Sequence, residues 1–331
     1  MTATEAESLQ DLQQYGGQAV IEGVMMRSLH YYAVACRKPD GEIVTHCEHV
    51  DNTLLKRFKW LNFPFGRGTL GLLDAMILGA KALQYASNVQ IPQNQNEKDS
   101  ATRISEIAVG STLVVSLIIA VIIFKLVPTL ITYFLHKHGF IAQNTSGHML
   151  NLIDGLIRIT FFFGYIFLIS RIENIKRVFM YHGAEHKAIN TLEARKPLDT
   201  VHTMKASRIH PRCGTSFIFV VLLLDLIAVV ILPRPENILL RFLLQVAVVP
   251  FVAGIAYEAI KLAGKYRKNP LVMAVFAPGM ATQYLTTREP DLDQVEVAIA
   301  ALKEVRTAEA AYKKGLGSET STENANIVVT G

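Results

Sequence analysis

Long apolar stretches separated by polar segments dominate the chain from about residue 104 onwards. Four of them approach the length of a membrane span: 107–124, 152–170, 217–232 and 239–260. A helix needs about twenty apolar residues to cross the hydrocarbon core, so the first stretch fits best and the third is short. The Pro-Arg-Pro turn at 233–235 predicts that the last two form a tight helical hairpin. The pattern predicts a mainly α-helical integral membrane protein with about four transmembrane helices.

A strand-like pattern appears near the N-terminus. Residues 31–37 suit a strand, a Pro-Asp-Gly turn follows at 39–41, and 42–48 suit the returning strand. Before them, glycines bracket the apolar run Gly16–Arg27, where they allow a close backbone approach that a β-carbon would block. We therefore expect a flexible N-terminus (1–15) and a small N-terminal α+β cytoplasmic module containing a β-hairpin (16–62).

An apolar helix and a polar linker are expected in the next segment, 63–103. The helix, roughly 70–86, is short for a span and carries two charged residues, which favours a position at the membrane interface. Spanning or re-entering the bilayer stays open for it. Gly66, Gly68 and Gly71 match the dinucleotide-binding spacing, but Pro64 disfavours a preceding strand and no βαβ unit surrounds them. We reject that interpretation.

Basic residues are concentrated between the second and third apolar stretches. The segment 171–212 contains nine Lys and Arg residues, whereas the loop 136–149 contains only Lys137. By the positive-inside rule, the basic loop and both termini lie in the cytoplasm of a multi-pass protein of the inner (plasma) membrane. We divide the rest of the chain into segments accordingly: two transmembrane helices (104–170), a basic cytoplasmic loop (171–216), a transmembrane hairpin (217–260), a cytoplasmic region with a surface helix near 295–305 (261–314), and a disordered tail (315–331).

Composition agrees with a membrane protein. The chain has 331 residues, 50% of them hydrophobic, and its mean hydropathy is +0.28. The formal net charge is +5, but the basic residues flank hydrophobic stretches, so we expect lipid and no nucleic acid as a partner. Three cysteines (Cys36, Cys47 and Cys213) are too few and too scattered for a disulfide framework, which favours a reducing compartment.

The segment Tyr181–Lys187 contains the most specific chemistry. His182 and His186 are four residues apart, so on a helix both imidazoles leave the same face. With Glu185 they form H-x-x-E-H, the reversed zincin pattern, in which two histidines hold zinc and the glutamate acts as general base. We expect a divalent metal, with zinc as first choice. The alternative is a basic juxtamembrane helix whose polar side chains face water or lipid headgroups.

A second segment, His210–Phe217, is expected to complete the site. Catalytic zinc usually has three protein ligands and an open position, and His210 and Cys213 are the nearest candidates. Cys213 lies at the start of the third span beside basic residues, which favour a thiolate. It is therefore open to three roles: metal ligand, nucleophile with a histidine base, or small residue in a tight turn. Glu22 and Glu193 are weaker candidates for the ligand set.

Charged residues inside the apolar stretches are costly unless paired, hydrated or close to the membrane edge. They are Asp154, Arg158, Asp225 and Glu258. For Asp225, in the middle of its stretch, we expect a buried partner on a neighbouring helix such as Arg158. A proton or substrate path is the alternative.

Four blocks in order along the chain resemble the YqhQ-like family of uncharacterised multi-pass membrane proteins, found in bacteria and plastid-bearing lineages. They are Gly16–Arg27, His182–Lys187, His210–Phe217 and Leu285–Pro290. The resemblance extends to about Lys303, and it implies a multi-pass membrane protein of a family described as predicted metal-dependent enzymes. It implies no particular substrate or reaction.

These observations together predict a membrane-embedded, metal-dependent enzyme, a hydrolase, with its site on the cytoplasmic face. His182 and His186 would bind the metal with His210 or Cys213, and Glu185 would activate water. The substrate would be a lipid, a lipid-linked compound or a membrane-protein segment. A non-catalytic scaffold or assembly factor that binds a membrane protein is one alternative. A small-solute transporter, which with four spans would need a dimer, is the other.

Overall fold

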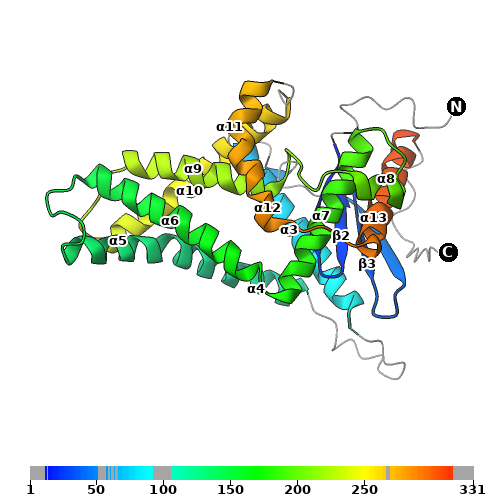
Figure 1. The fold of residues 1–331 in the computed structure, drawn as a ribbon, viewed down its shortest axis with the longest axis horizontal. Helices are drawn as coiled ribbons and strands as arrows, with labels where there is room; N and C mark the ends of the chain where they lie inside the picture. The colour runs from blue at the N-terminus through cyan, green and yellow to red at the C-terminus, as the bar shows by residue number, and fades with distance from the viewer. Residues whose placement is uncertain are drawn as a thin grey trace.

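The computed structural model describes residues 14–50, 66–91, 106–265 and 269–315, together with Leu12, Arg57, Phe58, Trp60 and Phe63. A long helical bundle is joined at one end to a smaller lobe built on a sheet (Figure 1). The predicted polar linker, nearly all of the predicted tail and most of the predicted flexible N-terminus lie outside the described residues.

The sheet of the lobe has four antiparallel strands in sequence order, β1 (Gly16–Val20), β2 (Gly23–Arg27), β3 (Tyr31–Arg37) and β4 (Ile43–His49). The predicted hairpin is confirmed as β3 and β4, which pair Val34 with His46. Strands β1 and β2 were not predicted: β1 has only five residues, two of them glycine, and residues 23–26 of β2 are buried on both faces of the sheet. A strand buried on both faces lacks the alternation that identifies a strand in a sequence.

Helices from distant parts of the chain cover both faces of the sheet. Side chains alternate between the faces of a strand, so β2 and β3 supply two cores. One face packs against α7 (Glu173–Glu193) and α13 (Leu292–Lys313), and the other against the C-terminal half of α3 (Gly66–Val89). The small α+β module therefore takes three of its helices from beyond residue 62.

The prediction of a surface helix near 295–305 is wrong, because this segment belongs to the buried helix α13. It begins with a capping box in which Asp291 and Gln294 exchange hydrogen bonds, and it lies against the sheet. Its apolar residues form the centre of the lobe core, with Val295, Val297, Ala298, Ala301, Leu302 and Val305 all fully buried. A helix that crosses a sheet buries a wide face. Many residues of this face are alanines, so its hydrophobicity differs too little from that of the opposite face for the sequence to reveal it.

Helix α3 connects the lobe to the bundle. Leu78, Ala82 and Ala86 pack against the sheet, whereas Gly68 lies so close to α10 (Ile238–Lys265) that a β-carbon there would come within 2.7 Å of Tyr257 Cβ. Its remaining face keeps an apolar stripe exposed, formed by Leu73, Met76, Ile77 and Leu83. The predicted contact of this helix with the membrane interface stays a prediction.

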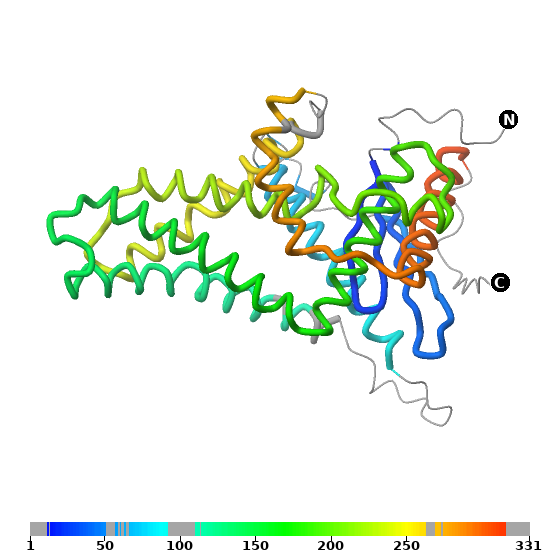
Figure 2. The backbone as a smooth tube through the Cα atoms, viewed as in Figure 1, coloured from blue at the N-terminus to red at the C-terminus, as the bar shows by residue number. Residues whose placement is uncertain are grey.

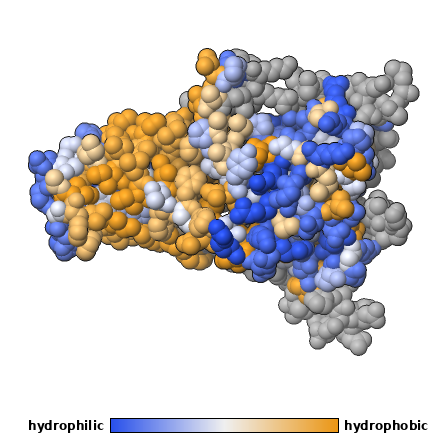
Figure 3. Space-filling model, in the orientation of Figure 1, coloured by the Kyte–Doolittle hydropathy of each residue, from blue (hydrophilic) through white to orange (hydrophobic). Residues whose placement is uncertain are grey.

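The bundle contains four helices long and apolar enough to cross a membrane, as predicted. They are formed by α4 (Glu106–Val121) with the π-helical turn η2 (Ile122–Leu126) and α5 (Val127–Lys137), by α6 (Gly147–Ile169), by α9 (Gly214–Ile231), and by α10. Figure 3 shows a hydrophobic band over the bundle, bounded by hydrophilic surface at its far tip and on the lobe. This banding is what a bilayer-spanning bundle requires.

The first span extends further than predicted. We expected it to end near Lys125 and Pro128, but the helix continues to Lys137. Pro128 follows directly after the π-helical turn, whose wider ring relieves the clash that a proline ring makes with an earlier carbonyl. Lys125 belongs to that turn and points into the bundle, where it is buried.

A network of paired charges crosses the bundle interior. Asp225 on α9 accepts from Arg158 on α6, as predicted, and from Lys125, which was not predicted, each at 2.5 Å. Gln245 on α10 joins the network by accepting from Arg158 at 2.9 Å and donating to Asp154 at 2.9 Å. All four of these long apolar helices therefore contribute a polar side chain to one buried cluster.

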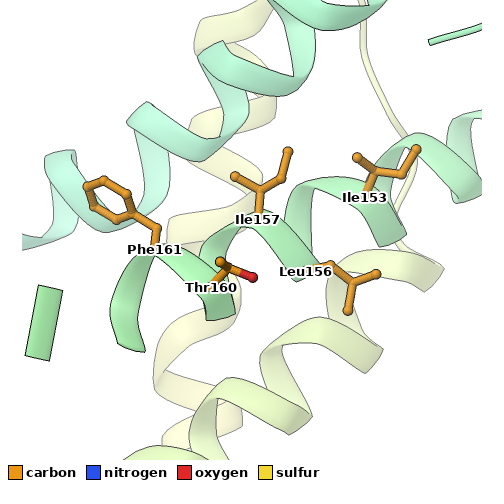
Figure 4. Close-up of a pocket in the computed structure, with 5 residues that line it drawn as sticks. All are labelled: Ile153, Leu156, Ile157, Thr160 and Phe161. Carbon is orange, nitrogen blue, oxygen red and sulfur yellow. The ribbon is translucent and has the colours of Figure 1, made fainter. Parts of the chain in front are cut away.

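A shallow hollow of about 360 Å³ lies on α6, lined by Ile153, Leu156, Ile157, Thr160 and Phe161 (Figure 4). Its lining is almost entirely hydrocarbon and contains no titratable group. We assign no chemistry to it.

Candidate functional site

The predicted residues of two distant segments come together where the bundle meets the lobe. His182 and His186 lie one turn apart on α7, and Cys213 is the N-cap residue of α9. His182 Nε2 lies 3.2 Å from Cys213 Sγ, and the two imidazole centroids are 4.4 Å apart. One donor atom from each of the three residues lies within 4.8 Å of the others, the only such group of three found among the described residues.

Backbone carbonyls orient both imidazoles. His182 Nδ1 lies 2.9 Å from the carbonyl oxygen of Thr286, and His186 Nδ1 lies 2.6 Å from that of Arg208. A carbonyl oxygen only accepts hydrogen bonds, so each Nδ1 donates and each Nε2 carries the free lone pair. In His182 that lone pair is directed at the Cys213 sulfur. The arrangement is the one by which metal-binding histidines are usually held.

Gly183 allows the contact between His182 and the Thr286 carbonyl. A β-carbon at Gly183 would lie 2.1 Å from the carbonyl oxygen of Arg288, so only glycine lets the segment after α12 (Gln283–Thr286) cross α7 this closely. Figure 2 shows this segment, in orange, passing across the green α7. The Arg288 amide donates to the Phe179 carbonyl at 2.8 Å, which fixes the crossing and brings Thr286 to His182.

Glu185 lies on the lobe side of the site and is buried. Its Oε2 is 3.5 Å from His186 Nε2, and the backbone N–H of Gly17 on β1 donates to its carboxyl group. Burial raises the pKa of the Glu185 carboxyl, while the nearby histidines and this hydrogen bond act in the opposite direction. A β-carbon at Gly17 would lie 2.9 Å from Glu185 Cγ, which gives a reason for glycine at this position.

His210 lies beside the group of three but not in it. Its ring centroid is 5.8 Å from that of His186, its Nδ1 accepts from the Arg212 amide at 3.3 Å, and its Nε2 is 3.5 Å from Glu193 Oε1. Burial lowers the pKa of the His210 imidazole, although Glu193 opposes that shift. The His210 Nε2 atom is buried and makes no hydrogen bond with any described residue, and the predicted role of His210 as a metal ligand stays a prediction.

Glu193 and Glu22, the weaker candidates, both pair with arginines. Glu193 forms an ion pair with Arg212. Glu22, at φ 48° between β1 and β2, accepts from Arg177 at 2.6 and 2.5 Å. The Arg177 guanidinium holds the pKa of the Glu22 carboxyl below its usual value, against the effect of burial. Both carboxylates therefore serve to hold loops against α7.

Several residues that build the site were not predicted. Gln283 is fully buried, accepts from the His210 amide at 2.8 Å, and donates to the His210 carbonyl at 2.7 Å. Lys187, also buried, donates to the carbonyls of Met204 and Ala206 beside α8 (Thr200–Lys205) and pairs with Glu289 at 2.6 Å. Backbone carbonyls occur at every residue, so no residue type in the sequence could identify those of Thr286 and Arg208 as partners.

Comparison with known proteins identifies relatives but no activity. The chain is 34% identical over 302 residues to the protein of Bacillus subtilis (strain 168) called Uncharacterized protein YqhQ, an alignment that covers 89% of this chain and 93% of that protein. No solved structure matches the chain. Residues 63–308 match the family described as Protein of unknown function (DUF1385). The chain therefore belongs to the DUF1385 family and is a relative of YqhQ.

Proposed function

We propose that the protein is a membrane-embedded, metal-dependent hydrolase whose site faces the cytoplasm. The observation that carries this proposal is the orientation of His182 and His186. Each donates its Nδ1 proton to a backbone carbonyl, and the two rings meet Cys213 with one donor atom apiece within 4.8 Å. These hydrogen bonds leave Nε2 of both rings as the acceptor atom, which is the tautomer that metal binding through Nε2 requires.

The donor set fits zinc. Imidazole nitrogen and thiolate sulfur are the ligands that zinc prefers, and three protein ligands with one open position are typical of catalytic sites. His182, His186 and Cys213 would hold the ion, which when bound supplies a Lewis acid that polarises the substrate and makes water more acidic. In this assignment Cys213 is a ligand, and its alternative role as a nucleophile is not needed.

Glu185 is the residue that we assign to proton transfer. Its carboxylate is held by the Gly17 amide and lies 3.5 Å from His186 Nε2, next to the group of donor atoms. From there Glu185 can take a proton from an attacking water and return it to the leaving group. The buried surroundings of its carboxyl group strengthen the base, because they disfavour the charged form.

The position of the site suggests the kind of substrate. Cys213 directly precedes α9, one of the four helices long enough to cross a membrane. A site at the end of such a helix is reached by molecules held at the bilayer surface. We therefore propose a lipid, a lipid-linked compound or a membrane-protein segment as substrate, approached from the cytoplasmic side that the basic residues of 171–212 indicate.

Metal content tests the proposal. Protein purified in detergent should contain about one zinc per chain by elemental analysis, as expected for a single three-ligand site. The double substitution His182→Ala with His186→Ala should remove the zinc. The control is His202→Ala, which removes an exposed histidine of α8 that pairs with Asp199, and it should keep the zinc. Glu185→Gln should keep the zinc and lose hydrolysis. Wild-type protein without stoichiometric metal would refute the assignment.

One specific observation favours the scaffold or assembly factor. Leu73, Met76, Ile77 and Leu83 form the exposed apolar stripe of α3, which a second membrane protein could cover. An assembly factor should still capture its partner from membranes as Glu185→Gln and should lose it as Ile77→Asp. We prefer the hydrolase, because the stripe does not explain the oriented histidines.

Transport has less support. Four charged side chains suggested it: Asp154, Arg158, Asp225 and Glu258. Glu258 pairs with Arg67 of α3 at 2.6 Å, and the first three pair with one another and with Lys125 inside the bundle. Two cations and two anions balance, and Gln245 bridges them. A closed, neutral network of this kind is assigned to helix packing rather than to a path for solutes.

A further inference from the structure

A small apolar cavity lies directly beside the candidate site, on its bundle side. Its volume is about 50 Å³, and its walls come from α6, α9 and α12, with Phe162, Phe163, Ile166, Ile218, Phe219 and Leu285 as the apolar lining. No polar surface is exposed in it. Both α6 and α9 belong to the helices long enough to cross a membrane, so the cavity lies between spans.

Two of the lining residues belong to the site itself. Thr215 Oγ1 lies 3.2 Å from Cys213 Sγ, and the carbonyl of Thr286 accepts from His182 Nδ1. The cavity therefore ends at the residues that hold the imidazole and the thiol. A molecule with its reacting group at the site would extend its adjoining atoms into this cavity.

The lining selects hydrocarbon. A peptide backbone needs hydrogen-bond partners when it is buried, and a wall without polar surface offers none. Ile218 is 40% exposed on the outer surface of the bundle, where acyl chains would surround it in a bilayer. Entry from the side therefore requires no passage of the chain through water.

Basic residues lie at the same end of the bundle. Arg171 follows α6 five residues after Ile166 and stacks on Phe167 at 4.5 Å, and Arg208 lies over Tyr284 at 5.4 Å. Arginine at the end of a span attracts an anionic headgroup, and aromatic rings anchor at the headgroup level. Arg208 is also paired with Glu289 at 3.7 Å, so the charge that complements an anionic amphiphile comes from Arg171.

We infer that the substrate is an anionic membrane lipid, whose acyl chain enters the cavity between α6 and α9 and brings its headgroup linkage to His182 and Cys213. Only the statement about the reacting linkage rests on the proposed function. The cavity has about a third of the ~150 Å³ volume of an engineered protein cavity that binds benzene. It therefore accepts only the first carbons of the acyl chain, and the remaining carbons lie along the surface of the bundle.

Lipid binding to the full-length protein tests this inference. Delipidated protein in detergent is titrated with phosphatidylglycerol, phosphatidylcholine, glycerol phosphate or a leucine-rich peptide, and bound molecules are counted by native mass spectrometry. One phosphatidylglycerol should bind per chain, more tightly than the other three probes. Ile218→Trp and Ile166→Trp, which narrow the cavity from opposite walls, should each weaken it about tenfold, the loss expected from two unburied methylene groups.

The matched control is Leu223→Trp, which adds the same side chain at an exposed position of α9 outside the cavity lining. It should bind phosphatidylglycerol as the wild type does. Equal binding by all three variants, or preference for the peptide or for glycerol phosphate, would overturn the inference. Zinc content is measured on the same samples. Wild-type protein that contains zinc but binds no phosphatidylglycerol would refute the inference alone, and wild-type protein that binds phosphatidylglycerol but contains no zinc would refute the hydrolase alone.

Discussion

Single residues determine how closely the segments of the site approach one another. Gly183 is the clearest case, because the segment after α12 packs directly against its α-carbon. The consequence is indirect: the side chain that Gly183 lacks would displace Thr286, and Thr286 is the hydrogen-bond acceptor that orients His182. Gly183 has no reactive side chain, yet it controls the orientation of the His182 imidazole.

Gly183→Ala should therefore weaken zinc binding. The displaced carbonyl no longer orients His182, and loss of such a partner typically costs about 10- to 100-fold in metal affinity. The measurement is a zinc titration against a competing chelator. Gly164→Ala, where an added β-carbon meets nothing within 4 Å, is the control and should bind zinc normally. Unchanged affinity in Gly183→Ala would show that the crossing is not required.

A second prediction concerns Glu309 on α13, which accepts from Ser28 at 2.7 Å and from His30 Nδ1 at 2.8 Å. Burial would raise the pKa of the Glu309 carboxyl, but the hydrogen bonds from His30 and Ser28 outweigh it and hold the pKa below its ordinary value of 4.5. A lowered pKa in the folded state means that the stabilisation is complete above 4.5 and is lost as the pH falls through the lower value.

The melting temperature of wild-type protein should thus fall between pH 5 and pH 3, and Glu309→Gln should remove part of that dependence while lowering stability at pH 7. Glu296→Gln, at an exposed pair with Arg37, serves as the control. An identical pH profile in Glu309→Gln and wild type would contradict the assignment.

At the scale of elements, the buried charges determine how the spanning helices pack. The π-helical turn directs the Lys125 side chain into the bundle. Lys125 and Arg158 of α6 therefore both pair with Asp225. Burying charge in a bundle is costly, and the cost is offset only when every partner is present. Such a network disfavours alternative arrangements of the same four helices.

Asp225→Asn should destabilise the bundle by about 3–5 kcal/mol, because it leaves two buried cations with one remaining acid. Unfolding in detergent followed by circular dichroism measures this loss. Lys125→Met combined with Asp225→Asn restores the balance between Arg158 and Asp154 and should recover part of the stability. An unchanged free energy of unfolding in Asp225→Asn alone would contradict this prediction and show that water reaches the network.

For the whole molecule, an even number of membrane-length helices places the first and last described elements at the same end of the bundle (Figure 1). Strand β1 and helix α13 lie in the same lobe, and the candidate site is at the junction of that lobe with the bundle (Figure 1). The four blocks of the family resemblance therefore all meet at the end of the bundle that joins the lobe. Segments far apart in the chain contribute to a single candidate site, and we predict that this end lies at the cytoplasmic surface of the membrane.

Cysteine labelling in intact cells tests this topology. In a Cys47→Ser background, Ala142→Cys, exposed in the turn between α5 and α6, should react with a membrane-impermeant maleimide from outside. Lys205→Cys, exposed at the end of α8, should react only after permeabilisation. The reverse pattern would place the site outside the cytoplasm and contradict the positive-inside assignment.

Properties that depend on neighbouring residues were predictable from the sequence alone. The four long apolar stretches are visible in the sequence, the β3–β4 hairpin follows from its Pro-Asp-Gly turn, and four-residue spacing puts His182 and His186 on one helix face. Tertiary structure decided the rest: the burial of α13, the inward position of Lys125, and the carbonyls that orient the histidines. These depend on which distant segments pack together, and long-range packing leaves no local period in a sequence.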